Sequence, residues 1–296
     1  MNPCNSPQHL VARFAPSPTG RLHLGHGWSA LMAHDLARST GGQFRLRIED
    51  IDGTRSRPEH VEGILEDLRW LGIGWDGPLV FQSGRLEIYE AVLEQLKGEG
   101  LVYPCFCTRA EIAAEIAASL SAPHGPDGPH YPGTCRRLSK TERRRRIEEE
   151  PHGWRIDMAR AAALAGPLVW EDLDIGPVTA DPLSAGDVIL ARKDAPTSYH
   201  LAATIDDAGM GITHIIRGRD LFAATHIHRL LQALLGLPTP SYRHHGLLLG
   251  ADGKRLAKRN GGQSLASLRA SGTDPARLVQ DLRQLVFPIG ISLGEA

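Results

Sequence analysis

The apolar side chains of the first hundred residues are spaced as in alternating strands and helices. Residues 10–15 form a short apolar run that ends at prolines and a glycine, which predicts a buried strand. Apolar positions at helical spacing then cover residues 28–36, and apolar and charged residues alternate over residues 44–49, as in a strand. Helical spacing returns over residues 61–71 and 86–96. Strands and helices in this order predict a parallel α/β sheet.

Local signals indicate where two helices begin. Ser56 and Glu59 have the spacing of a capping box, just ahead of the apolar positions at 61–71. Asp274 and Pro275 match an N-cap followed by proline at the first helical position, and predict a final helix.

The pattern changes after residue 100, where cysteines, a Pro/Gly/His-rich stretch and a highly charged stretch follow one another. We interpret residues 101–197 as an inserted α+β domain that separates two halves of the α/β domain, 10–100 and 198–245. The second half is predicted from an apolar strand over residues 213–217 and a helix over 227–234. Residues 246–296 are expected to form a loop and a short C-terminal helical segment.

Composition excludes several classes of protein. The chain of 296 residues is long enough for about two domains. Its 42% hydrophobic and 23% charged residues are ordinary for globular proteins and exclude wholesale disorder. No apolar run is long enough to span a membrane, and the polar N-terminus lacks the apolar core of a secretory signal, so we expect a cytoplasmic protein. The net charge of -1 means that any contact with RNA must come from local basic patches.

Two histidines lie where the first strand gives way to the first helix. His23-Leu-Gly-His26 follows the run from Arg13 to Gly20. Ligands of an open parallel sheet bind beyond the carboxyl ends of its strands, and helix N-termini favour phosphate. The two imidazoles could therefore face a triphosphate, with Gly25 admitting a flat ring close to the backbone. The alternative is a solvated loop with a helix cap, but the position directly after the first strand favours a ligand site.

Three cysteines gather in the predicted insertion. Cys105, Cys107 and Cys135 suit tetrahedral zinc, because thiolates in a reducing compartment favour that metal. The fourth ligand would be one of Tyr131, His124 and His130, and by chemistry alone a histidine is preferred. The alternative is three reduced cysteines without a metal.

The first motif resembles the class I aminoacyl-tRNA synthetases, and within them the glutamyl branch. The likeness extends from about residue 10 to about residue 270. His23-Leu-Gly-His26 is similar to the HIGH signature of the family, and Arg255-Leu-Ala-Lys-Arg259 to its KMSKS signature. Lys258 is kept in the second signature, whereas Ala257 stands in place of the central serine, so a slower activation step is expected.

The resemblance implies the fold and a set of site residues. The fold is a Rossmann-like parallel sheet with an inserted zinc-bearing α+β domain. Catalysis falls to His23, His26 and Lys258, which together with Gly25 also bind ATP. A glutamate substrate needs guanidinium groups for its two carboxylates and a carboxylate for its ammonium. The implied glutamate-binding residues are Arg13, Ala15, Ser17, Glu49, Tyr199 and Arg217. For Glu49 the alternative is a surface ion pair with Arg47 or Arg55.

A short branch of this family is the better match. In that branch zinc is held by Cys-x-Cys and Tyr-x₃-Cys, which here implies one structural ion on Cys105, Cys107, Tyr131 and Cys135. Only 37 residues follow Arg259, so we expect no anticodon-binding domain. Members of the short branch activate glutamate with ATP and Mg²⁺, and attach it to queuosine at the wobble position of tRNA(Asp).

Other functions stay open at this point. The chain could be a truncated ordinary glutamyl synthetase, a catalytically inactive RNA-binding paralogue, or a nucleotidyltransferase that uses another acid. We expect a monomer, although nothing in the sequence fixes the oligomeric state. Two basic groups could contact RNA, one over residues 136–146 and one made of Arg243, Lys254, Arg255, Lys258 and Arg259. Glutamates dilute the first group, which favours an ordinary solvated helix there.

Overall fold

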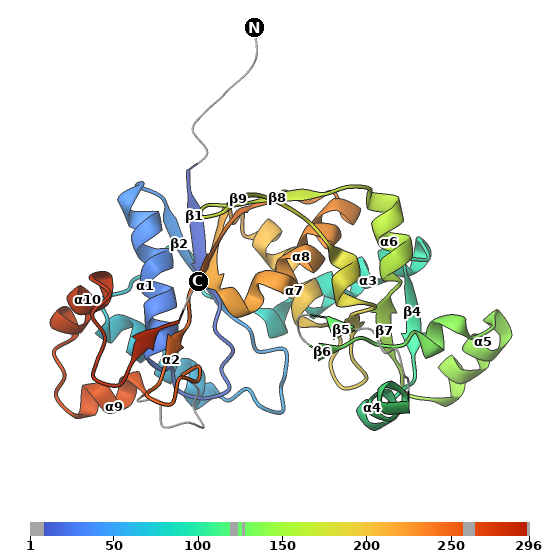
Figure 1. The fold of residues 1–296 in the computed structure, drawn as a ribbon, viewed down its shortest axis with the longest axis horizontal. Coiled ribbons are helices and arrows are strands. Elements are labelled where there is room, and N and C mark those ends of the chain that lie inside the picture. The colour runs from blue at the N-terminus through green and yellow to red at the C-terminus, as the bar shows by residue number, and fades with distance from the viewer. Residues whose placement is uncertain (1–8, 119–123, 126–127, 257–263, 295–296) are drawn as a thin grey trace, which may run out of the picture.

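A seven-stranded sheet forms the centre of the molecule (Figure 1). The computed structural model describes residues 9–118, 124–125, 128–256 and 264–294. The strand order is β3-β2-β1-β11-β12-β8-β9, and every neighbouring pair is parallel except β8 and β9. The strands are β1 (Val11–Phe14), β2 (Gln43–Ile48), β3 (Val80–Phe81), β8 (Val169–Asp172), β9 (Gly176–Thr179), β11 (His214–Gly218) and β12 (Ser241–His245). The predicted parallel α/β sheet is confirmed.

The predicted helices of both halves are present as α1 (Leu24–Ser39), α2 (Pro58–Trp70), α3 (Leu86–Gly98) and α8 (Phe222–Leu234). Helix α7 (Tyr199–Gly209), which the sequence analysis did not predict, precedes β11 in the second half. Helix α1 packs against β1, β2 and β11, and it buries Leu24, Trp28 and Leu31 at the spacing that predicted it. On β2 the apolar positions are fully buried as expected, but the charged Arg47 between them is fully buried too.

A second sheet lies at the opposite end of the molecule from α1 and α10 in Figure 1. Its strands β4 (Val102–Cys105), β7 (Gly153–Ile156) and β10 (Ile189–Ala191) pair antiparallel, with β7 in the middle. Helices α4 (Arg109–Ala118), α5 (Lys140–Glu149) and α6 (Met158–Ala165) and the short pair β5 (His124–Gly125) and β6 (Gly128–Pro129) come from the same stretch of chain. The hairpin of β8 and β9 leaves this region and extends the large sheet beside β12. The division at residues 101 and 197 stays a prediction.

One local prediction was wrong. Helix α2 has Arg57 as its N-cap and Pro58 at its first position, so Ser56 lies one residue too early to cap it and its hydroxyl has no hydrogen-bond partner among the described residues. The strand before the second signature, β13 (Leu248–Leu249), pairs with β14 (Ser292–Leu293) in a separate small sheet. The last strand of the large sheet is β12, which the sequence did not indicate because charged and polar residues fill it.

The C-terminal helices pack beside the first ones. Helices α9 (Leu265–Ala270) and α10 (Pro275–Arg283) share one hydrophobic core with α1 and α2. The predicted N-cap of α10 is confirmed, since the Asp274 carboxylate accepts a hydrogen bond from Ala276 N at 3.0 Å. Four short 3₁₀ helices complete the described chain, Gln82–Arg85, Thr134–Arg137, Pro182–Ala185 and Arg219–Leu221. Among the described helices we find none with the length and apolar character that crossing a bilayer requires.

Candidate active site

A cavity of about 760 Å³ opens at the carboxyl ends of β1, β2 and β11 and at the N-terminus of α1. Ligands of parallel α/β sheets bind at this edge. Every predicted glutamate- or ATP-binding residue within the described chain lines this one cavity: Arg13, Ala15, Ser17, His23, Gly25, His26, Glu49, Tyr199 and Arg217. Lys258 lies outside the described residues, and its neighbours Arg255 and Leu256 also line the cavity.

The two signature histidines stack on each other at the start of α1. Their ring centroids are 3.7 Å apart, and His26 Nδ1 accepts a hydrogen bond from His23 N at 3.3 Å. A Cβ on Gly25 would lie 3.2 Å from two atoms of the His23 ring, which is too close for an ordinary contact. A side chain at position 25 would therefore push the His23 ring a few tenths of an ångström out of place, and glycine avoids this. Both imidazoles belong to a helix N-terminus, the end of a helix that attracts phosphate.

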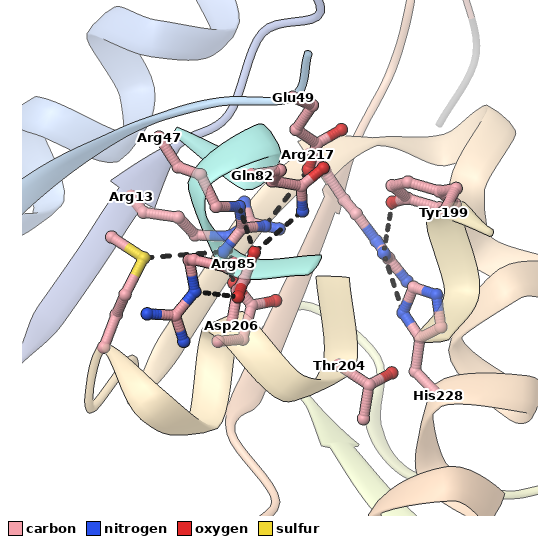
Figure 2. Close-up of polar contacts among 12 residues, drawn as sticks. Arg13, Arg47, Glu49, Gln82, Arg85, Tyr199, Thr204, Asp206, Arg217 and His228 are labelled. Carbon is pink, nitrogen blue, oxygen red and sulfur yellow. Dashed lines mark hydrogen bonds and ion pairs between the residues drawn. The ribbon is translucent and has the colours of Figure 1, made fainter. Parts of the chain in front are cut away.

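A buried network of ion pairs holds two of the predicted glutamate-binding residues (Figure 2). Asp207 Oδ1 accepts from Arg13 Nε at 3.0 Å and from Arg47 Nη1 at 2.7 Å. Arg47 Nη2 also donates to Glu49 Oε1 at 3.1 Å. Asp206, next along α7, binds Arg85 Nε at 2.6 Å. The network fixes Arg13 and Glu49 against the cavity wall through Arg47 and Asp207.

Two interpretations of Glu49 were considered, binding of the substrate ammonium and a surface ion pair, and the structure agrees with part of each. It pairs with Arg47, as the alternative supposed, whereas Arg55 binds Asp52 instead. The pair is buried and not at the surface, since the Glu49 side chain is 11% exposed, and Glu49 also lines the cavity. Burial raises the pKa of Glu49, although Arg47 and Arg13 oppose that rise.

Arg217 is a buried cation whose hydrogen-bond partners within the described chain are all uncharged. Its Nη1 donates to Tyr199 OH and to His228 Nδ1, both at 3.3 Å, as Figure 2 shows. Its Nε donates to His244 Nε2 at 3.2 Å, and its Nη2 to Thr225 Oγ1 at 2.6 Å. Burial, together with the charge of Arg217, holds the pKa of His228 well below its usual value and lowers that of His244 to about 4. A buried guanidinium among neutral groups favours an anionic ligand.

The basic groups predicted to contact RNA are largely paired with acids. In the first group Arg145 binds Glu142 and Glu149, and Arg146 binds Glu150, as expected for an ordinary solvated helix. In the second group Arg243 binds Asp174 at 3.1 Å, and Arg255 binds Asp220. Lys258 and Arg259 lie outside the described residues.

The three clustered cysteines lie close enough together to hold a metal ion. Their Sγ atoms all lie within 4.8 Å of one another, and ligands of a tetrahedral zinc ion at about 2.3 Å would be about 3.8 Å apart. Tyr131 OH lies 3.4 Å from Cys107 Sγ. His130 is not part of this cluster in the described chain, and the side chain of His124 is outside the description. Hydrogen bonding between Cys105 and Cys135 raises the pKa of Cys105 to about 12 and lowers that of Cys135 to about 6.

Replacing Cys107 by serine is expected to remove zinc from the protein, because a hydroxyl is a far weaker zinc ligand than a thiolate. Elemental analysis of the purified protein should find one zinc ion per chain in the wild type and much less in Cys107→Ser. The matched control is Cys4→Ser, which alters the one cysteine that is not among the predicted zinc ligands and should keep the metal. Wild-type protein purified without chelators and free of zinc would contradict the zinc site.

The sequence missed the residues that support the binding groups. Asp206 and Asp207 are adjacent acids in a helix after Tyr199, and such a pair at buried helical positions was a usable signal. Arg47 was considered only as a surface partner of Glu49, and nothing in the sequence singled out His228 and His244, because the roles of all three depend on strands and helices that meet only in the fold.

Comparisons with known proteins agree with this geometry. A family model described as tRNA synthetases class I (E and Q), catalytic domain, matches residues 9–292. The chain is 48% identical to a glutamyl-Q tRNA(Asp) synthetase of Rhodobacter capsulatus, over 94% of this chain and 99% of that protein. It is also 48% identical to a protein of the same name from Symbiobacterium thermophilum, over 93% and 86% of the two chains.

Among solved structures, a glutamate tRNA ligase from Elizabethkingia meningosepticum, crystallised with its amino acid, has a similar fold. The TM-score is 0.77 at 30% identity, and the match covers 94% of this chain. It covers 61% of the ligase, so this chain spans about three fifths of that protein.

Proposed function

The chain belongs to the class I tRNA synthetases for glutamate and glutamine, and we propose that it activates glutamate with ATP and transfers it to queuosine in the anticodon loop of tRNA(Asp). Relatives that carry this activity in their name are 42–48% identical to the chain and are matched over 82–99% of their own length. Glutamate–tRNA ligases are 38–40% identical and are matched over only 58–60% of theirs. A truncated ordinary synthetase and an inactive paralogue are less well supported. A tRNA substrate would place the reaction in the cytoplasm.

The surroundings of Arg217 are the main support for glutamate as the substrate. Its buried charge has only uncharged hydrogen-bond partners in the described chain, and the carboxylate of a glutamate side chain would supply the missing anion. Glutamine, with a neutral amide, would leave the guanidinium without an anion, at a cost typical of a buried unpaired charge. Arg13 and Arg47 each already bind Asp207, so Arg217 is the group that favours glutamate over glutamine.

The other cavity residues would orient glutamate for reaction. Arg47 occupies Oε1 of Glu49, and the second oxygen of that carboxylate would receive the ammonium group. Arg13, fixed by Asp207, would hold the α-carboxylate near the histidines. This arrangement positions the α-carboxylate oxygen for attack on the α-phosphate of ATP, and positioning of this kind is a major source of rate enhancement.

Activation would form glutamyl-adenylate and release pyrophosphate. His23 and His26 would stabilise the phosphates as negative charge shifts to the leaving group, with Lys258 assisting and Mg²⁺ sharing the charge. The hydroxyl of queuosine would then attack the carbonyl of the mixed anhydride, with release of AMP. We propose that Cys105, Cys107, Tyr131 and Cys135 hold a structural zinc ion, which would stabilise the fold around the second sheet and take no part in either step.

Pyrophosphate exchange tests the activation step. With glutamate and ATP the enzyme should incorporate labelled pyrophosphate into ATP, without tRNA. With glutamine the value of kcat/KM should be at least about 100-fold lower, because Arg217 would lose its anion. Equal exchange with both amino acids would contradict the role of Arg217, and no exchange with either would favour an inactive paralogue.

A further inference from the structure

The strand register brings an acid outside the cavity into the neighbourhood of Arg217. Arg217 of β11 and His244 of β12 are paired neighbours, so both side chains leave the sheet on the same face. Strand β8 pairs with β12 on its other side, and there Asp172 lies opposite Tyr242. The three groups form a continuous chain, with Arg217 Nε 3.2 Å from His244 Nε2 and His244 Nδ1 2.7 Å from Asp172 Oδ2.

The direction of each hydrogen bond in this chain is determined. The Nε–H group of Arg217 can only donate, so His244 Nε2 must accept, and the ring proton must lie on Nδ1. That proton is donated to Asp172 Oδ2. The other carboxylate oxygen, Oδ1, accepts from the backbone N–H of Asp174 at 3.0 Å. Asp172 therefore has a fixed donor on each of its two oxygens.

The surroundings keep the His244 ring in place. The rings of Trp170, Phe222 and Tyr242 lie 5.6, 5.0 and 5.9 Å from it, centroid to centroid. The side chains of His244 and Asp172 are 0% and 1% exposed, so water cannot replace either as a partner. If the proton moved to His244 Nε2, that nitrogen could donate to Thr225 Oγ1, which lies 3.1 Å away, but the Nε–H group of Arg217 would lose the acceptor it has in the described chain. A buried donor without an acceptor is costly, so Arg217 would be driven to change its orientation.

We propose that Asp172 is a positioning residue for substrate recognition, which acts through the tautomer of His244 to hold Arg217 in its carboxylate-binding orientation. Neither Asp172 nor His244 lines the cavity, so this role is separate from contact with the substrate. The inference rests on the proposed role of Arg217 in binding the carboxylate of glutamate.

The substitution Asp172→Asn should reverse the direction of the hydrogen bond between residue 172 and His244. The backbone N–H of Asp174 still requires an acceptor, so the amide oxygen of Asn turns to it and the amide NH₂ faces His244 Nδ1. His244 must then accept at Nδ1 and carry its proton on Nε2, where it opposes the N–H of Arg217. Exchange of a buried aspartate for asparagine is known to select the wrong tautomer of a histidine in this way.

Two readouts test the proposal, with Asp174→Asn as the matched control. Asp174 is two residues away and carries the same charge. Its side chain pairs with Arg243 at the surface and takes no part in the hydrogen bonds that link Arg217, His244 and Asp172. In Asp172→Asn the KM for glutamate should rise about tenfold or more, while the KM for ATP stays close to wild type. In Asp174→Asn both KM values should be unchanged. An Asp172→Asn variant whose glutamate KM matches that of the control would overturn the proposal.

The second readout is the tautomer itself, measured by ¹⁵N NMR of histidine-labelled protein, with His244→Gln used to assign the resonance. Wild-type His244 should carry its proton on Nδ1, and Asp172→Asn should move it to Nε2. A proton on Nε2 in the wild type would overturn the proposal even if the variant failed to fold. Wild type without glutamate-dependent exchange would refute the proposed function, whereas a normal wild type with an unaffected variant would refute only this inference.

Discussion

Glutamate activation should fall at least about 100-fold in kcat/KM when Arg217 is replaced by alanine, because leaving a buried ionic group without its partner costs about 3–5 kcal/mol. Arg217 is 4% exposed and is surrounded by Tyr199, Thr225, His228 and His244, none of which supplies a negative charge. Alanine would remove the only cation in this part of the cavity that does not already bind an acid of the described chain. Pyrophosphate exchange at varied glutamate concentration measures the loss.

Two variants separate substrate binding from folding. Arg229→Ala removes an arginine of α8 that bonds to the backbone oxygen of Val169, away from the cavity, and should leave activity unchanged. Arg217→Lys keeps the charge but cannot present a planar fork, so it should recover only part of the loss. Unchanged activity in Arg217→Ala would remove the substrate assignment, and a matching loss of ATP affinity and melting temperature would indicate a damaged fold.

The second large effect is expected at His26. His26→Ala should lower the rate of adenylate formation about 100-fold to 1,000-fold, the usual result of removing one group that stabilises charge in a transition state. Glutamate binding should change little, because the glutamate-binding residues lie in or just after β1 and β2, in α7 and in β11, while His26 lies in the first turn of α1. Single-turnover formation of glutamyl-adenylate, combined with equilibrium binding of glutamate, distinguishes the two quantities.

His26 also supports the start of its helix, so the experiment needs a structural control. Its Nδ1 accepts from His23 N, and losing a cap costs about 0.5–2 kcal/mol of stability. His26→Asn keeps an acceptor close to the Nδ1 position but lacks the rest of the ring, and should lose activity while keeping stability. His60→Ala, on α2 and away from the cavity, should behave as wild type. Equal losses of glutamate binding and of rate in His26→Asn would contradict a role in phosphate stabilisation.

Local patterns were enough to predict the part of the site built on the first two strands. Apolar alternation predicted β2, helical spacing predicted α1, and the position of the histidines between β1 and α1 predicted a ligand site at that edge. These features depend on residues close in sequence. They required only the rule that parallel sheets bind ligands at the carboxyl ends of their strands.

Features that depend on pairing between distant segments could not be predicted. Strand β12 reads Ser-Tyr-Arg-His-His and has no apolar alternation, yet it lies inside the sheet between β11 and β8. There His244 bonds to residues of β8 and β11, and Tyr242 bonds to a residue of α8. Arg47 appears in sequence as the polar member of an alternating strand. In the fold, α7 brings Asp207 to it, and this ion pair offsets the cost of burying the Arg47 charge. The β8–β9 hairpin likewise joins the large sheet through contacts that sequence spacing does not encode.

The most direct test of the proposed function is transfer of radiolabelled glutamate to tRNA(Asp) with and without queuosine, and to tRNA(Glu), in the presence of ATP. We expect label only on tRNA(Asp) that contains queuosine, and the label should survive removal of the 3′-terminal nucleotide, because the proposed acceptor lies in the anticodon loop. Label on tRNA(Glu) that is lost together with its 3′-terminal nucleotide would contradict it and identify an ordinary glutamyl synthetase.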